Sequence, residues 1–117
     1  MLRKYDIVLV DLEPALGAEK RGVRPCVILQ NNLVNQSQIQ TVTLAPLTKT
    51  ARDVPSALWI IATDFNGLQA DSRIEVSQLR TVDQGRIHKT IGQLESKYYL
   101  DLSQKISNFI DLNDEYI

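Results

Sequence analysis

An arginine and a short run of hydroxyl and amino groups have the chemistry to act on a phosphodiester. Arg24 precedes Pro25, which favours extended backbone at the arginine, and Thr48-Lys49-Thr50 follows a later apolar run. A guanidinium binds phosphate through two hydrogen bonds, and its high pKa makes it a stabilising group rather than a general base. With Thr48 it would support metal-free RNA cleavage by the 2′-hydroxyl. The alternative is an ordinary surface arginine and a strand-end threonine.

Other catalytic chemistries find little support in the sequence. His88 is the only histidine, so two histidines cannot share acid and base roles within one protomer, and an exposed or partly packed histidine is expected. Cys26 precedes an apolar run and is predicted to be a core residue, because no basic residue is placed by sequence to lower its pKa. No metal-ligand spacing is present, so no cofactor is expected.

Length and composition are those of one globular domain, expected to span residues 1–117. Hydrophobic residues make up 44% of the chain and the formal net charge is −1, so a site for a polyanion must be local. Residues 1–60 carry seven basic and five acidic side chains, whereas residues 61–117 carry six and nine. The single cysteine and the lack of a long apolar stretch predict a cytoplasmic protein with no membrane association.

The hydrophobic pattern predicts short strands followed by one helix. Alternating or continuous apolar runs mark six candidate strands, at residues 7–10, 27–29, 41–47, 57–61, 72–79 and 89–94. Pro46 should end its ladder or mark an edge. In the fifth strand Arg73, Glu75 and Ser77 alternate with apolar residues, so that face is expected to be wet.

The last part of the chain changes to a helical period. An apolar stripe follows Ser96, the expected N-cap, at Tyr99, Leu102, Ile106 and Phe109. Strands followed by a terminal helix predict a small antiparallel barrel plugged by that helix. The long connection at residues 12–25, with two prolines and two glycines, is expected to have a defined shape and a function. If the second and third strands pair, Arg24 and Thr48 lie at one rim.

Several segments, in order and spacing, resemble MazF/PemK-type toxins of type II toxin–antitoxin systems, the mRNA interferases. The opening that carries the resemblance is Tyr5-Asp6-Ile7-Val8-Leu9-Val10-Asp11-Leu12-Glu13-Pro14, then Gly17-x-Glu19-x-x-Gly22-x-Arg24-Pro25-x-Val27-Ile28-x-Gln30-Asn31. The later segments are Ala45-Pro46-Leu47-Thr48, Gln78-Leu79-Arg80-Thr81-Val82-Asp83, Arg86-Ile87 and Ile91-Gly92-Gln93-Leu94. The similarity covers essentially the whole chain.

The resemblance implies a fold, an activity and partners. The fold would be a β-rich α+β domain, an SH3-like antiparallel β-barrel with a C-terminal α-helix of the CcdB/MazF-like type, forming a homodimer. The activity would be sequence-specific, metal-independent cleavage of single-stranded RNA to 2′,3′-cyclic phosphate and 5′-hydroxyl ends. The regulatory partner would be a cognate antitoxin whose acidic, disordered tail occupies the RNA groove, which suits a groove built for phosphate.

Site residues follow from the same resemblance. Arg24 and Thr48 match the catalytic arginine and threonine, Glu19 and Gln78 match positions that line the RNA groove, and Lys4 matches a basic position near it. Lys4 is equally well read as part of a solvated terminus. Lys49 adds an ammonium beside Thr48, and base selection is expected from the polar side chains of Gln30, Asn31 and Gln78.

Three residues depart from the family pattern or from what RNA binding would favour. Tyr5 stands where many relatives have glycine, which would reshape the entry to the first strand. Ser77 stands where one branch has an aspartate assigned to acid/base work, so the arginine/threonine chemistry fits better. Trp59, between Leu58 and Ile60, is expected in the core or a dimer contact rather than stacked on a base.

Two other functions fit the same fold. One is a DNA gyrase poison like CcdB. In that branch the C-terminal residues make the contact, and the end of this chain, Asp114-Glu115-Tyr116-Ile117, resembles them only weakly. The other is a catalytically inactive relative that binds RNA or antitoxin without cleaving.

Overall fold

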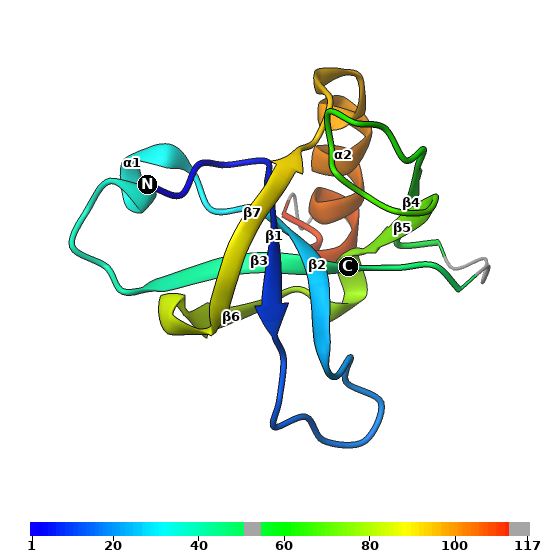
Figure 1. Cartoon of the computed structure of the whole chain (residues 1–117). Coiled ribbons are helices and arrows are strands. Elements are labelled where there is room, and N and C mark those ends of the chain that lie inside the picture. Colours follow the sequence, from blue (N-terminus) through cyan, green and yellow to red (C-terminus); the bar gives the residue numbers. More distant parts are fainter. Residues whose placement is uncertain (51–54, 113–117) are drawn as a thin grey trace.

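The computed structural model describes residues 1–50 and 55–112, which form a curved antiparallel sheet with one long helix against it (Figure 1). The strands are β1 (Asp6–Asp11), β2 (Val23–Ile28), β3 (Thr41–Thr48), β4 (Ala57–Ile60), β5 (Ser72–Glu75), β6 (Arg80–Asp83) and β7 (Ile87–Gln93). The helices are α1 (Asn32–Asn35) and α2 (Tyr99–Ile110), with 3₁₀ turns η1 (Val76–Gln78), η2 (Gln84–Arg86) and η3 (Ser96–Tyr98). This confirms the expected SH3-like barrel with a C-terminal helix.

The long strand β3 is the centre of the sheet. The strand order is β4-β5-β3-β2-β1-β7, and β6 also pairs with β3. On one side β3 pairs first with β6, up to Leu44, and then with β5, from Leu47. Pro46 falls between these two ladders, and its pair with Cys26 is the last one that β3 makes with β2. The proline therefore ends a ladder as predicted, but it lies in a central strand and not at an edge.

Alternating side chains place one apolar cluster on each face of the sheet. The first is covered by α2, whose Leu102 is fully buried, and it contains Ile7, Val27, Ala45, Leu47, Ile60, Leu68, Ile74, Val76 and Leu94. The second contains Val8, Val10, Leu12, Cys26, Ile28, Val42, Leu44 and Val82. Burying one leucine such as Leu102 contributes about 2 kcal/mol of stability. Tyr99 and Ile106 extend the predicted stripe, whereas Phe109 is exposed.

The predicted fifth strand, residues 72–79, contains only β5 and the turn η1, and the next strand, β6, begins at Arg80. Its expected wet face is also wrong, because Arg73 and Glu75 are 1% and 6% exposed. Arg73 Nη2 lies 2.5 Å from Glu75 Oε1, and Lys20 Nζ from the first loop lies 3.7 Å from the same oxygen. The alternation of this segment carries no information about which distant residues, such as Lys20, will contact it.

The helices differ from the prediction in two ways. Ser96 does not cap α2, because η3 comes first and neither of the residues at the two N-caps, Glu95 and Tyr98, makes a side-chain capping bond. The short helix α1 was not predicted. Its cap is Asn31, whose side chain accepts a hydrogen bond from Val34 N.

The entry to β1 explains how a tyrosine replaces glycine. Tyr5 has φ +74°, a left-handed conformation that favours glycine. Its ring stacks on Tyr99 with centroids 3.7 Å apart, and its amide donates to Ile28 O at 2.8 Å. These contacts offset the backbone strain and tie the start of β1 to α2.

Candidate functional site

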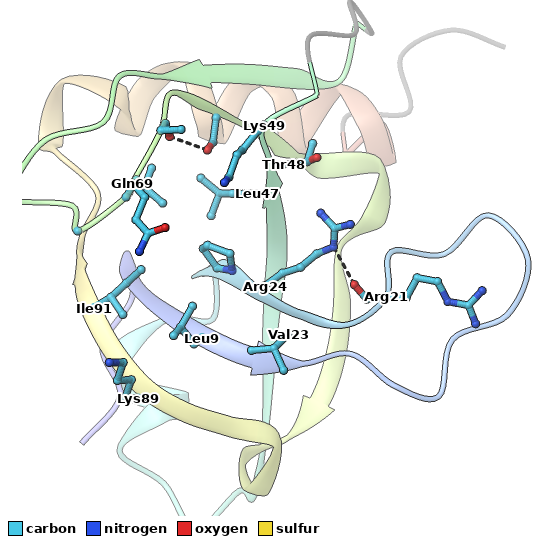
Figure 2. Close-up of a pocket in the computed structure, with 15 residues that line it drawn as sticks. Leu9, Arg21, Val23, Arg24, Leu47, Thr48, Lys49, Gln69, Lys89 and Ile91 are labelled. Carbon is cyan, nitrogen blue, oxygen red and sulfur yellow. Dashed lines mark hydrogen bonds between the residues drawn. The ribbon is translucent and has the colours of Figure 1, made fainter.

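Strand register brings Arg24 and Thr48 together. In the antiparallel β2–β3 pair Cys26 lies opposite Pro46, and continuing this register by two residues places Arg24 opposite Thr48. Figure 2 shows the Arg24 guanidinium directed toward Thr48. Arg24 Nε donates to Arg21 O at 2.8 Å, which orients the group from the first loop. The predicted approach of these two residues at one rim is therefore found.

The Thr48 hydroxyl is held at a defined place on the sheet. Thr48 is 4% exposed and pairs on its other side with Arg73 of β5. The amide of Thr50 donates to Thr48 Oγ1 at 3.4 Å, and the two threonine hydroxyls are 3.5 Å apart. Because both contacts are long, the Thr48 hydroxyl can replace them with a shorter hydrogen bond to a ligand.

Arg24 and Thr48 border a cavity of about 550 Å³ (Figure 2). Its floor is apolar, formed by Leu9, Val23, Pro25, Leu47 and Ile91. Arg24, Lys49 and Lys89 stand around it, and no aspartate or glutamate is among the described residues that line it. Arg21 also borders the cavity, but its side chain pairs with Glu13 at 3.7 Å. In a chain of net charge −1, this is a local cationic site.

The connection between β1 and β2 has the defined shape that was predicted. Side chains from elsewhere in the chain hold its first residues, because Arg80 Nη1 donates to Leu12 O at 3.4 Å and Arg86 Nη1 donates to Glu13 O. Near its end Lys20 N donates to Gln78 Oε1 at 3.3 Å. Glu19 is exposed in this loop and accepts a hydrogen bond from Leu16 N at 2.5 Å. Glu19 and Gln78 therefore lie at the loop, outside the lining of the cavity.

Three predicted RNA-binding residues lie at the other end of β2. The amide of Lys4 donates to Asn32 Oδ1 at 2.7 Å, and Asn31 caps α1. The Gln30 side-chain amide already makes hydrogen bonds within the protein, since its Nε2 donates to Asn35 Oδ1 at 2.9 Å and to Thr41 O at 3.2 Å. None of the three lines the cavity, and the stretch of β2 from Arg24 to Ile28, about 13 Å long, lies between them and Arg24.

The remaining candidates behave as ordinary structural residues. Burial raises the pKa of the Cys26 thiol to about 12, although Arg24 and Arg80 act in the opposite direction. The thiol is therefore protonated at neutral pH, as expected of a core cysteine. His88 is exposed, as predicted, whereas Trp59 is not in the core, being 46% exposed on the edge strand β4. Within residues 1–50 and 55–112 no three His, Cys, Asp or Glu side chains could share a metal ion.

Four polar residues that line the cavity were not predicted as site residues, and they are Arg21, Gln69, Ser72 and Lys89. Lys89 reaches the site because β7 pairs with β1, which sets Lys89 opposite Leu9. Gln69 comes from the connection between β4 and β5. Lys89 and Gln69 belong to no motif, and only the alternation of residues 87–93 could have placed Lys89 on an accessible face.

The comparisons with known proteins agree over nearly the whole chain. Residues 3–110 match the family model of the PemK-like, MazF-like toxin of type II toxin-antitoxin systems. A relative named endoribonuclease MazF from Staphylococcus epidermidis is 36% identical over 117 residues, covering 93% of this chain and 96% of that protein.

Solved structures show the same fold. The Mycobacterium tuberculosis toxin MazF-mt6 superposes with a TM-score of 0.76 and 25% identity, over 91% of this chain and 96% of that one. A mycobacterial endoribonuclease in complex with its cognate antitoxin superposes with a TM-score of 0.78 and 17% identity, over 96% and 97%. By its sequence match and its fold, the chain belongs to the PemK-like, MazF-like toxins of type II toxin-antitoxin systems.

Proposed function

We propose that this protein is an endoribonuclease toxin that cleaves single-stranded RNA at a specific sequence without a metal ion. The observation that carries the proposal is that Arg24 and Thr48 border one cavity together with Lys49 and Lys89, with no carboxylate among its described lining residues. The name of the Staphylococcus epidermidis relative, an endoribonuclease, supports the reaction class.

The proposed reaction needs only charge stabilisation and positioning from the protein. The RNA 2′-hydroxyl attacks the adjacent phosphorus, a bond to the 2′-oxygen forms, and the bond to the 5′-oxygen breaks. The proton lost by the 2′-hydroxyl is balanced by the proton gained at the 5′-oxygen, so the products are a 2′,3′-cyclic phosphate and a 5′-hydroxyl. Arg24 and the Thr48 hydroxyl donate hydrogen bonds to the phosphate oxygens, where negative charge increases in the transition state.

The other predicted residues would contact RNA away from the scissile phosphate. Lys49 is placed to neutralise a neighbouring phosphate, and Glu19 and Gln78 would meet RNA at the first loop. An RNA strand bound at the cavity would contact Lys4, Gln30 and Asn31 only if it extended past the far end of β2.

The same cations suit an inhibitor of opposite charge. We infer that a cognate antitoxin with an acidic, disordered tail covers the cavity, because carboxylates can pair with Arg24, Lys49 and Lys89 as phosphates would. The mycobacterial endoribonuclease in complex with its cognate antitoxin supports this, because that protein has the same fold.

A homodimer is proposed from exposed apolar side chains. The edge strand β4, the residue after it and the end of α2, which contacts β4, expose Trp59, Ile61, Phe109, Ile110 and Leu112. Exposed apolar side chains gathered on neighbouring elements are typical of an interface. The dimer contact considered for Trp59 fits this surface.

The test is cleavage of a long mixed-sequence RNA in EDTA, followed by mapping of the new 5′ ends. We expect discrete cuts with 5′-hydroxyl groups. Arg24→Ala should abolish them while circular dichroism shows an unchanged fold, and the matched variant Arg3→Ala, at an exposed terminal arginine, should cut at the wild-type rate. Cutting that survives in folded Arg24→Ala would contradict the site assignment.

The alternative functions predict intact RNA in this assay, and a separate assay with DNA gyrase distinguishes them. A folded wild-type protein that leaves RNA intact would favour the inactive binding module, and topoisomerase-linked DNA breaks would favour the gyrase poison. The C-terminal residues Asp114-Glu115-Tyr116-Ile117, on which the latter depends, lie outside the described residues.

A further inference from the structure

One wall of the cavity is a long connection, residues 61–71, that is held rigidly from inside. Asn66 is fully buried and organises it. Its Nδ2 donates to Ile61 O at 2.9 Å and to Glu95 Oε1 at 3.1 Å, and its Oδ1 accepts from Thr63 N and Leu68 N, both at 3.1 Å. Because this buried amide bonds to several backbone groups of the connection, it holds the connection in one conformation.

Two glycines let this connection lie directly against β7. Gly67 has φ +72°, and a Cβ there would collide with the carbonyl of Ile91. A Cβ on Gly92 would collide with the backbone of Asn66. The wall therefore keeps a fixed distance from β7 and from the Ile91 side of the cavity floor.

This rigid wall presents one polar side chain to the cavity. Figure 2 shows the Gln69 amide directed into the space between Lys49 and Ile91. Gln69 is exposed, and its amide makes no hydrogen bond to any other residue within the described part of the chain. An amide with a free donor and a free acceptor, on a fixed support, is prepared to bind a ligand that offers the complementary pair.

We propose that the cavity holds an unpaired RNA base next to the scissile phosphate and that Gln69 reads the edge of that base. The inference rests on the proposed function and deepens it. The apolar floor suits the face of a base, which is poorly hydrated, and Arg24, Lys49 and Lys89 suit the flanking phosphates. The carboxamide can form two hydrogen bonds with one base edge, and a base with a different donor and acceptor pattern loses them.

The first measurement is selection of sequences without cleavage. The wild-type protein is incubated with a random pool of single-stranded oligonucleotides in which every 2′-hydroxyl is replaced by fluorine, and the bound fraction is sequenced. We expect a preference of about tenfold for one base at one position, and we expect Gln69→Leu to reduce this preference to about twofold or less. Gln104→Leu, an equivalent change at an exposed residue of α2, should keep the wild-type preference.

The second measurement is cleavage mapping with unmodified RNA. In Gln69→Leu we expect new cuts at sequences that differ from the wild-type site at the same single position. Gln69→Glu should select against the original base, because a carboxylate accepts but does not donate. Preferences in both assays that are identical in wild type and Gln69→Leu would overturn the inference, as would a bound pool with no base preference at any position.

The two proposals fail in different ways. RNA left intact by the wild type, together with a Gln69-dependent preference in the uncleavable pool, would remove the nuclease and keep the base site. Discrete cleavage whose sequence does not depend on Gln69 would keep the nuclease and remove the base site.

Discussion

Arg24 and Thr48 divide the proposed work by their chemistry. The guanidinium carries permanent charge and is oriented by its bond to Arg21 O, whereas the threonine contributes only a hydroxyl on a buried side chain. The function of Thr48 can therefore be removed without changing its shape.

Thr48→Val tests this at the residue scale. Valine keeps the branched shape but cannot donate a hydrogen bond, so we expect kcat to fall about 10²- to 10³-fold. Thr48→Ser restores the hydroxyl and should recover most of the rate. Initial rates on a fluorogenic RNA that contains one mapped site give the comparison. A Thr48→Val rate within threefold of wild type would show that the hydroxyl is not used.

Glu95 makes part of the stability depend on pH. Burial opposes its ionisation, but hydrogen bonds from Thr63 Oγ1 and Asn66 Nδ2 outweigh that effect and lower the pKa of Glu95 from 4.5. Ionised Glu95 therefore stabilises the fold above about pH 4.5, and this contribution is lost as the pH falls through the folded pKa. We expect urea denaturation of Glu95→Gln between pH 3 and 6 to vary less with pH than that of the wild type. Parallel pH profiles would contradict the assignment.

Among the elements, the first loop and β5 are coupled through buried charge. Glu75 accepts hydrogen bonds from Arg73 and lies 3.7 Å from Lys20 Nζ, so the loop that carries Arg21 is attached beside the strand that pairs with Thr48. The pair of Arg73 and Glu75 is nearly inaccessible to water. Removing the Glu75 charge would take away an ionic partner that lies 2.5 Å from a buried guanidinium.

Glu75→Gln should therefore destabilise the protein by about 3 kcal/mol. Lys20→Gln is the matched control, because the Lys20 side chain is 25% exposed and its loss should change stability by less than about 1 kcal/mol. Urea denaturation followed by Trp59 fluorescence measures both. Equal and small effects would show that the buried pair contributes little.

At the scale of the whole molecule, a nearly neutral protein concentrates cations at one cavity. The net charge of −1 provides no general attraction for RNA, so the proposed RNA binding must depend on a few local contacts. No helix among the described residues is long and apolar enough to cross a membrane.

The salt dependence of RNA affinity measures how many phosphates the protein neutralises. For single strands, the logarithm of affinity falls with the logarithm of salt concentration by about 0.7 for each neutralised phosphate. Lys89→Gln should weaken binding and reduce this slope by about 0.7, whereas Lys97→Gln, at η3 and outside the cavity lining, should leave the slope unchanged. Fluorescence anisotropy with an uncleavable RNA gives both slopes. An unchanged slope in Lys89→Gln would remove that residue from the phosphate contacts.

The sequence by itself determined the features that depend on neighbouring residues. Apolar runs located the strands near residues 7–10 and 41–47, the helical period located α2, and the order of the motifs identified the family. Residue type alone was enough to single out Arg24 and Thr48 as candidates and to place Cys26 in the core. Such properties are local, because alternation and residue chemistry are written into consecutive positions.

Only the tertiary structure decided which distant segments cover or face one another. Tertiary contacts brought Arg24 and Thr48 to the border of one cavity, buried Arg73 and Glu75, and carried Gln69 from the connection before β5 to the same cavity. Each of these depends on contacts between residues far apart in the chain. A strand pattern specifies which face is apolar but not what will pack on it, and the site is built from those packing choices.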